Sequence, residues 1–425
     1  MVEFRIPEEI STFFDDEYGK MLLVKGAPGS GKTVFALTLL SMLKGNGAYL
    51  ATRVDSETMY KQHPWIKGEI SAANIIDAAQ SVRVQKTKEF TIKPLRYTDV
   101  PDFLKAVYAR TESMDNPVII IDSWDAVVSY TGYHAQKERE VLEHSLCDFC
   151  RRTKTKILLL AENTEQAPLD YLADGVVVLE SVMHDERRLR RMLLQKLRGC
   201  QIKNPVRLFS LDNGIFKSFI EFKEEEEEKE IAEPHPRAPI PDISDRRIST
   251  GIEDLDRVIG GYGTFNLFEG EYITYDIIAR ALSLNALNLG RSLLFVPWQE
   301  QIDRLMPFVE PKYRDNIEAV EDIRDLQDRI AGERRVIFIN LEEIEDEEQI
   351  KEEIAKLRSR RDVVIGFIGT DRGRGGFDYF ASTHIRTMFI SGVPCICGEV
   401  PRTEIHALEL DTAKGNPEIR LTPIV

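Results

Sequence analysis

The fold of the first half of the chain is decided by residues 21–34, which read Met21-Leu22-Leu23-Val24-Lys25-Gly26-Ala27-Pro28-Gly29-Ser30-Gly31-Lys32-Thr33-Val34. An apolar strand leads into a glycine-rich loop, and the loop opens the apolar helical pattern TVFALTLLSMLKG. This order matches the pattern GxxxxGK[ST] in the context of strand and helix that the pattern needs. The glycines let successive backbone N–H groups turn inward at a helix N-terminus, where the helix dipole also favours negative charge. The stretch therefore predicts a phosphate-binding loop.

A phosphate loop of this kind predicts ATP, or a close nucleoside triphosphate, as its ligand. We expect Lys32 to reach the β- and γ-phosphates and Thr33 to place its hydroxyl on Mg²⁺. A carboxylate is also needed at the end of a neighbouring strand, and Asp122 follows the apolar run 118–121 directly. The predicted nucleotide-binding residues are Gly26, Ala27, Pro28, Gly29, Ser30, Gly31, Lys32, Thr33 and Val34; Thr33 and Asp122 are the predicted metal ligands, and Lys32 and Asp122 are also predicted to be catalytic.

The rest of the first half alternates apolar, β-rich runs with helical patterns. Uninterrupted apolar strands separated by helices are typical of a parallel sheet that is covered on both faces. The last two runs lie close together in the sequence and indicate an antiparallel edge. The class is therefore α/β, with expected strands at 21–25, 48–52, 118–122, 157–161, 176–180 and 190–197.

A change in composition separates this half from the next. Residues 221–247 read EFKEEEEEKEIAEPHPRAPIPDISDRR, a like-charge run that passes into alternating prolines. Such a segment buries too little apolar surface to offset its chain entropy, although the acidic part alone also fits a solvated helix. We predict a domain at 1–220, an exposed linker at 221–246 and a second domain at 247–425. Fainter strand patterns in the second domain, also α/β, fall at 292–296, 336–339, 363–368, 387–390 and 405–410.

Composition limits the classes of function. The chain has 425 residues, 43% of them hydrophobic and 30% charged, as expected of a globular protein of two or three domains. Its formal net charge of -15 does not indicate nucleic-acid binding, because an acidic surface repels phosphate, although a local basic patch stays open. No run of 18 apolar residues occurs, and the five cysteines are sparse, so we expect a cytoplasmic protein without membrane insertion.

Several stretches resemble the KaiC branch of the RecA-like ATPases. In the first half these are LADGVVVL at 172–179, RRLRRMLLQKLRG at 187–199 and LFSLDNGI at 208–215. After the linker, RISTGIEDLDRVIGG at 247–261 resembles the opening of a KaiC-type domain. The resemblance implies two RecA/KaiC-like domains in tandem, each a mainly parallel sheet flanked by helices with an antiparallel edge. Within this branch the chain resembles the archaeal group that includes the gas vesicle protein D family.

The second half departs from the family at its phosphate loop. The chain reads TFNLFEGEY at 264–272, with carboxylates where the family has lysine and glycines, and an anion nest does not tolerate negative side chains at its mouth. The strand at 336–339 ends in Asn340 instead of aspartate, and TAKG at 412–415 replaces the family's K-x-R-G. We therefore expect a degenerate domain that binds no nucleotide and serves assembly or partner docking.

The first half departs at the catalytic glutamates. In KaiC-type ATPases the strand after the phosphate-loop helix ends in two glutamates that orient the attacking water, whereas the matching positions here are Arg53 and Val54. Neither side chain can act as a general base. Asp55 and Glu57 lie nearby as possible substitutes. Arg53 is open to two interpretations, as a group near the γ-phosphate or as a surface arginine that points away.

Further polar residues gain a role only through the resemblance. Lys196 and Arg198 match family residues that reach across a subunit interface to the neighbour's γ-phosphate, which implies a homo-oligomer; a solvated hairpin is the alternative. Glu162 and Asn163 fit the position at which this superfamily tests the γ-phosphate. Together these features predict an ATP-binding regulator, a weak ATPase whose hydrolysis is slow or dependent on assembly, with an unidentified protein partner. The alternatives are an active ATPase machine that acts on DNA or a protein partner, and an autokinase.

Overall fold

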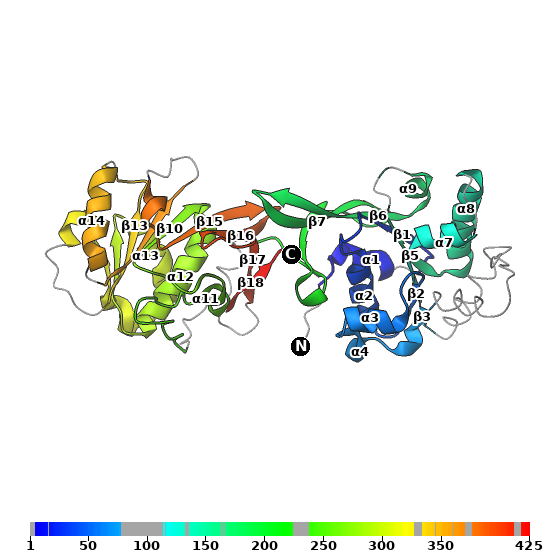
Figure 1. Ribbon diagram of the computed structural model, residues 1–425, viewed down its shortest axis with the longest axis horizontal. Coiled ribbons are helices and arrows are strands. Elements are labelled where there is room, and N and C mark those ends of the chain that lie inside the picture. Colours follow the sequence, from blue (N-terminus) through cyan, green and yellow to red (C-terminus); the bar gives the residue numbers. More distant parts are fainter. Residues whose placement is uncertain are drawn as a thin grey trace. The chain divides into compact units, whose positions relative to one another are not determined.

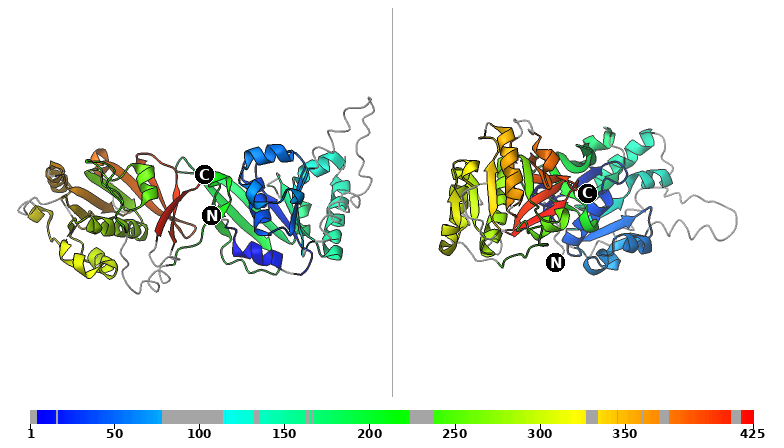
Figure 2. Two further views of the ribbon diagram at one scale, coloured as in Figure 1. Left: turned by 90° about the horizontal axis from the view of Figure 1, so that it is seen from below. Right: turned by 60° about the vertical axis from the view of Figure 1, so that its left-hand side comes forward.

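The chain forms two compact units, Met1–Phe219 with Val425, and Ile220–Ile424. The computed structural model describes residues 5–15, 17–77, 114, 116–131, 136–162, 165, 167–223, 238–326, 334–344, 346–359, 361–369, 376–411 and 418–425. Within these residues each unit is built on one nine-stranded sheet with helices packed against it (Figure 1; Figure 2). No helix in this part of the chain is long and apolar enough to cross a membrane.

The first unit places its phosphate-loop strand inside the parallel part of the sheet. The strands are β1 (Met21–Lys25), β2 (Gly47–Ala51), β3 (Ile75–Asp77), β4 (Val118–Asp122), β5 (Lys156–Ala161), β6 (Gly175–His184), β7 (Arg187–Leu197), β8 (Val206–Ser210) and β9 (Lys217–Ser218), in the order β3-β2-β4-β5-β1-β6-β7-β8-β9. The neighbouring strands from β3 through β2, β4, β5 and β1 to β6 pair parallel. The neighbours from β6 through β7 and β8 to β9 pair antiparallel. The carboxyl ends of β1, β2, β4 and β5 therefore meet at one edge.

Helices cover both faces of this sheet. They are α1 (Glu8–Asp15), α2 (Lys32–Met42), α3 (Ser56–Gln62), α4 (Ile66–Glu69), α7 (Trp124–Thr131), α8 (Gln136–Thr153) and α9 (Pro168–Leu172), with the short turns η1 (Ala72–Asn74) and η3 (Asp212–Gly214). Alternate residues of β1 enter different cores: Leu22 and Val24 pack with α1 and α2, whereas Met21 and Leu23 pack with α7 and α8. This is the two-sided burial that an uninterrupted apolar strand predicts.

The second unit repeats the first, strand for strand. Its strands are β10 (Phe265–Gly270), β11 (Leu293–Val296), β12 (Ile317–Ala319), β13 (Val336–Asn340), β14 (Val363–Ile368), β15 (Thr383–Ile390), β16 (Val393–Val400), β17 (His406–Asp411) and β18 (Glu418–Pro423). Their order is β12-β11-β13-β14-β10-β15-β16-β17-β18, which is the order of the first sheet with each strand replaced by its counterpart. Here too the first six strands pair parallel and the last four antiparallel.

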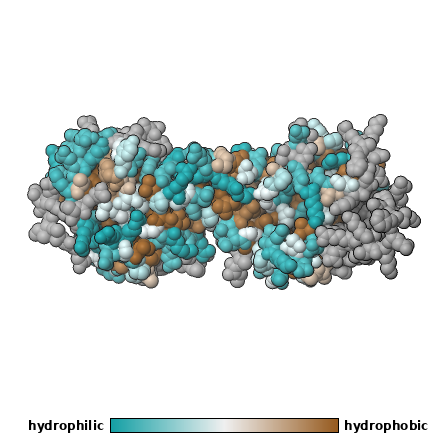
Figure 3. Space-filling model, in the orientation of Figure 1, coloured by the Kyte–Doolittle hydropathy of each residue, from teal (hydrophilic) through white to brown (hydrophobic). Residues whose placement is uncertain are grey.

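Helices α11 (Glu253–Ile259), α12 (Tyr272–Asn288) and α13 (Gln299–Leu305) pack on one face of the second sheet, and α14 (Glu347–Ser359) packs on the other. The short turns are η4 (Met306–Phe308), η5 (Pro311–Asn316), η6 (Ile323–Leu326) and η7 (Phe377–Phe380). Hydrophilic residues cover much of the surface that each unit shows in Figure 3, as a chain with 30% charged residues leads one to expect. The predicted α/β class, with two mainly parallel sheets and antiparallel edges, is confirmed.

Two features differ from the expectations. Strand β10 was not among the expected strands, because Asn266 and Glu269 interrupt its apolar run. The predicted linker at 221–246 is partly packed: the backbone of Ile240 exchanges two hydrogen bonds with the Asn285 amide, and Asp242 forms an ion pair with Arg291. These contacts lie within the second unit and give the end of this segment a fixed position, while residues 224–237 lie outside the described residues.

Candidate functional site

The phosphate-loop residues lie between the carboxyl end of β1 and the start of α2. Gly29 and Gly31 adopt φ angles of 78° and 101°, in the left-handed region where glycine is favoured. The Ser30 N–H donates to the Ala27 carbonyl at 3.1 Å, which closes the loop into a tight turn. The Ser30 hydroxyl is buried without a hydrogen-bond partner among the described residues. A loop with free polar groups at a helix N-terminus fits a triphosphate.

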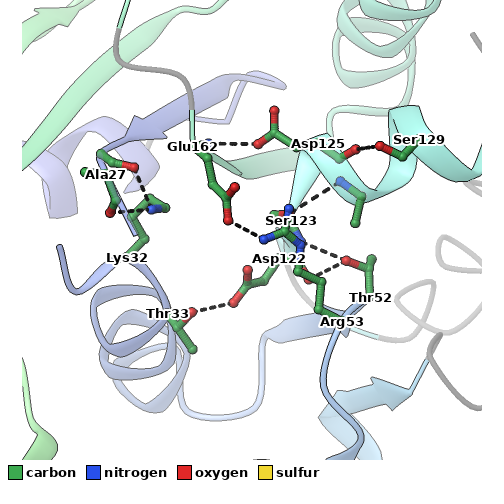
Figure 4. A network of polar contacts seen from close by, with 12 residues as sticks. Ala27, Lys32, Thr33, Thr52, Arg53, Asp122, Ser123, Asp125, Ser129 and Glu162 are labelled. Carbon is green, nitrogen blue, oxygen red and sulfur yellow. Dashed lines mark hydrogen bonds and ion pairs between the residues drawn. The ribbon is translucent and has the colours of Figure 1, made fainter. Parts of the chain in front are cut away.

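Lys32 begins α2 and points back over the loop. Its Nζ donates to the carbonyl oxygens of Gly26 at 2.7 Å and Ala27 at 3.1 Å (Figure 4). Burial lowers the pKa of Lys32, and the nearby carboxylates of Glu162 and Asp122 oppose that shift. The ammonium group is thus held at the loop by hydrogen bonds to two carbonyl oxygens. Because the lysine side chain is flexible, a phosphate oxygen can replace these acceptors.

Asp122 and Thr33 meet directly at the end of β4. The Thr33 hydroxyl donates to Asp122 Oδ2 at 2.7 Å, and the Tyr49 hydroxyl donates to the same oxygen at 2.5 Å. Burial, followed by the charge of Asp122, raises the pKa of Tyr49 well above its usual value, so Tyr49 remains a donor. A carboxylate beside a threonine hydroxyl is the oxygen donor set that Mg²⁺ prefers in phosphate-loop proteins. These two residues fit the predicted metal ion.

Arg53, which follows β2, points toward the end of β5. Its Nη1 forms an ion pair with Glu162 Oε1, and Figure 4 shows the Glu162 side chain between Arg53 and Lys32. The Glu162 N–H donates to Asp125 Oδ2 at 2.8 Å. Of the two interpretations left open for Arg53, the structure favours the first, a group on the side of the phosphate loop, because Arg53 pairs with Glu162 at the carboxyl edge of the sheet. Asn163 lies outside the described residues.

The two acidic residues after Arg53 are engaged elsewhere. Asp55 caps α3, because its Oδ1 accepts from the Thr58 N–H at 2.9 Å. Glu57 forms an exposed ion pair with Lys61, one helical turn further along. These contacts give neither carboxylate a direction toward Lys32.

Lys196 and Arg198 lie away from the phosphate loop of their own unit. Lys196 Nζ donates to the backbone carbonyls that end α9, of which Ala173 is the nearest at 2.6 Å. Arg198 forms an ion pair with Asp174, whose other carboxylate oxygen accepts from the Met21 N–H at 3.2 Å. Met21 is the amino end of β1, whereas the phosphate loop follows its carboxyl end. The register of the sheet thus places Arg198 level with the amino end of β1, at the edge opposite its own loop, whereas Lys196 pairs with Val176 and lies level with Leu23 in the middle of β1.

Another arginine of the same hairpin does reach the loop. Arg190 on β7 donates from Nη1 to the Gly29 carbonyl at 3.1 Å, and its Nε is buried without a partner among the described residues. The sequence interpretation missed Arg190 and Tyr49. For Tyr49 a signal existed, since a tyrosine in a fully buried strand needs a hydrogen-bond partner. Arg188 on the same strand is exposed whereas Arg190 is buried. Nothing in the sequence, however, identified the phosphate loop as the contact of Arg190.

The second unit has no room for such a loop at the matching place. Between the end of β10 and the start of α12, which are fully described, stands a single residue, Glu271, against six between β1 and α2. The Glu271 N–H donates to the Thr387 carbonyl at 3.1 Å, so the backbone group points into the sheet. Tyr275 stacks on Trp298 just beyond, with ring centroids 5.3 Å apart. Asn340 does end β13, and residues 412–415 lie outside the described residues.

Comparisons with known proteins agree with this geometry. Residues 10–196 match the family described as GvpD gas vesicle protein, P-loop domain. The chain is 31% identical over 263 residues to protein GvpD2 of Halobacterium salinarum, covering 60% of this chain and 52% of that protein. It is 24% identical over 256 residues to circadian clock protein KaiC3 of Synechocystis sp., covering 57% and 47%. The chain spans about half the length of these relatives. Residues 10–196 of the first unit are thus similar to the GvpD P-loop domain family, and the chain is also similar to a KaiC protein.

Proposed function

We propose that this chain is a cytoplasmic, KaiC-like regulator that binds Mg-ATP in its first unit and hydrolyses it slowly or only in assemblies. The observation that carries the proposal is the meeting of Lys32, Thr33 and Asp122 at one loop, while Arg53 and Val54 stand where the family has catalytic glutamates. In this proposal the second unit binds no nucleotide and offers a surface for assembly or for a protein partner.

Each residue has a defined task. The backbone N–H groups of 26–34 hold the β- and γ-phosphates, and the Lys32 ammonium exchanges its carbonyl contacts for phosphate oxygens. Thr33 and Asp122 hold Mg²⁺, which neutralises charge on the triphosphate. Arg190, bound to the Gly29 carbonyl, fixes the outer side of the loop. Binding thus depends on residues that the chain keeps, whereas the two glutamates on which the family's turnover depends are replaced by Arg53 and Val54.

Wild-type turnover is therefore expected to be slow. The two glutamates that orient the attacking water in the family are replaced here by Arg53 and Val54, so we expect a turnover at or below about 1 s⁻¹, the low end of the usual range. Steady-state phosphate release, with and without DNA, measures it. Brisk turnover that DNA stimulates would favour the alternative, an ATPase machine acting on DNA.

The full chain is expected to bind one ATP, because only the first unit places a loop between its central strand and the following helix. Calorimetric titration of the full chain measures the stoichiometry, and a titration of Lys32→Ala serves as the control. Two equivalents of saturable binding, or one equivalent that survives Lys32→Ala, would contradict the assignment of a nucleotide-free second unit.

We further propose that Lys196 and Arg198 act on the nucleotide of a neighbouring subunit. Among the described residues both make their contacts away from their own loop, Lys196 with the carbonyls that end α9 and Arg198 with Asp174, and an arginine that is 51% exposed can exchange partners at little cost. The measurements are activity per subunit over a wide dilution range and the turnover of a mixture of Arg198→Ala with Lys32→Ala chains. We expect activity per subunit to rise with concentration and the mixture to recover part of the turnover. Flat activity on dilution, with no recovery on mixing, would exclude the role in trans.

A further inference from the structure

Glu162 is a carboxylate at the carboxyl edge of the first sheet to which the proposed function gives no task. We propose that Glu162 accepts the proton of the water that attacks ATP, and that Arg53 is the positioning residue that holds its carboxylate. This inference rests on the proposed function, since it needs ATP at the phosphate loop. It replaces the missing glutamates after β2 with a carboxylate on a different strand.

The sheet brings Glu162 to the loop. Strand β5 lies between β4 and β1, and its last residue, Ala161, is in register with Lys25, the last residue before the loop. Glu162 therefore leaves the sheet beside both the loop and the strand that carries Asp122. Among the charged groups around Lys32, Glu162 has the largest effect in favour of its ammonium form, which places the carboxylate close to the group that receives the γ-phosphate.

Two contacts hold Glu162 in this direction. Its N–H donates to Asp125 Oδ2 at 2.8 Å, which fixes the backbone, and Arg53 Nη1 holds Oε1, which fixes the carboxylate. The side chains of Arg53 and Glu162 are 44% and 36% exposed, so the pair is accessible to water and contributes little to stability. Arginine has five N–H donors, and those not used on Glu162 can bind a phosphate oxygen.

The other carboxylates among the described residues of this edge have different tasks. Asp122 is engaged by Thr33 and Tyr49, and Asp125 accepts from the Glu162 N–H. Asp55 caps α3 and Glu57 pairs with Lys61. The Glu162 carboxylate, in contrast, is bound by a single side chain, Arg53, among the described residues, so that its second oxygen is left for a water.

The step balances without any further reagent. The oxygen of a water forms a bond to the γ-phosphorus, and the bond between that phosphorus and the bridging oxygen breaks, with its electron pair leaving on ADP. The proton of the water passes to a Glu162 carboxylate oxygen and is later returned to phosphate or solvent. The products are ADP and phosphate, and nothing is oxidised or reduced.

The test compares Glu162→Gln with Glu57→Gln in the full chain. Glutamine keeps the size of the side chain and accepts a hydrogen bond from Arg53, but it cannot take up a proton. We therefore expect turnover to fall by about 10² to 10⁴, while the ATP-induced rise in melting temperature stays unchanged. Glu57→Gln removes a carboxylate from the neighbouring helix and is expected to leave both readouts at the wild-type level. Arg53→Met is expected to lower kcat more than it changes KM, and Arg53→Lys to recover part of the loss.

The outcomes separate this inference from the proposed function. Glu162→Gln with wild-type turnover overturns the inference, as does a wild type that binds ATP but shows no turnover at any concentration. A loss of the ATP-induced shift in Glu162→Gln, with the ADP-induced shift kept, also overturns it, because Glu162 would then be a binding contact to the γ-phosphate. If the wild type shows no ATP-induced shift at all, the proposed function itself fails.

Discussion

Replacing Lys32 by alanine is expected to abolish the ATP-induced rise in melting temperature of the full chain. Lys32 is the one side-chain cation hydrogen-bonded to the carbonyls of the described loop at Gly26 and Ala27, and burial strengthens its field at the loop. At an ATP concentration a thousand times Kd, binding stabilises the folded state by about 4.1 kcal/mol. For a unit of this size that corresponds to a rise of roughly 8 to 16 °C, which thermal scanning with and without Mg-ATP measures.

The matched control is Lys61→Ala. Lys61 is exposed and forms an ion pair with Glu57 on the surface of α3, away from the loop, so its loss is expected to leave the ATP-induced shift intact. A full shift in Lys32→Ala would show that the loop does not hold the triphosphate. A reduced shift in Lys61→Ala as well would show that the assay reports net charge instead of a specific site.

The parts of the site that were predictable are those encoded locally. The loop, Lys32 and Thr33 lie within one short stretch, where strand, glycines and helix follow each other in a pattern that has one common outcome. Asp122 was predictable because a carboxylate at the end of a buried strand completes that pattern. The conclusion needed no knowledge of the order of the strands.

The remaining contacts depend on the strand order, which local patterns do not contain. Arg53 follows β2 and Glu162 follows β5, and the two residues meet only because both strands flank β4. Arg190 reaches Gly29 because β7 continues past the end of β1. Contacts between residues this far apart in the sequence are set by the register of neighbouring strands. They cannot be predicted from any single stretch of sequence.

Strand β10 shows how a polar residue can conceal a buried strand. Asn266, the second residue of this strand, is completely buried and breaks the apolar run expected of a central strand. Its amide is nevertheless satisfied: Oδ1 accepts from the Gly263 N–H and the Thr383 hydroxyl, and Nδ2 donates to the Val364 carbonyl. The sequence shows the polar residue but not its partners, so a satisfied buried amide and an exposed one look alike.

The second large effect is expected for Asp122→Ala, which should remove the Mg²⁺-dependent part of ATP binding and nearly all turnover. The metal supplies several kcal/mol of charge stabilisation in the reaction, so a loss of its carboxylate should slow turnover by at least about 10²-fold. ATP binding in the presence of a chelator should match the wild type, because Lys32 and the backbone of the loop are unchanged. Calorimetric titration with and without Mg²⁺ separates the two contributions.

Asp122 also stabilises the fold, and Tyr49→Phe distinguishes this role from metal binding. In Asp122→Ala the buried Tyr49 hydroxyl loses its acceptor, which should lower the free energy of unfolding by about 1 to 3 kcal/mol. Tyr49→Phe keeps the carboxylate and should retain the Mg²⁺ dependence. In the double variant the unsatisfied hydroxyl is absent, so we expect part of the lost stability to return while Mg²⁺ dependence stays lost. If Asp122→Ala keeps the full Mg²⁺-dependent increment of ATP binding, its carboxylate serves only to hold Tyr49 and Thr33, and the metal must be bound elsewhere.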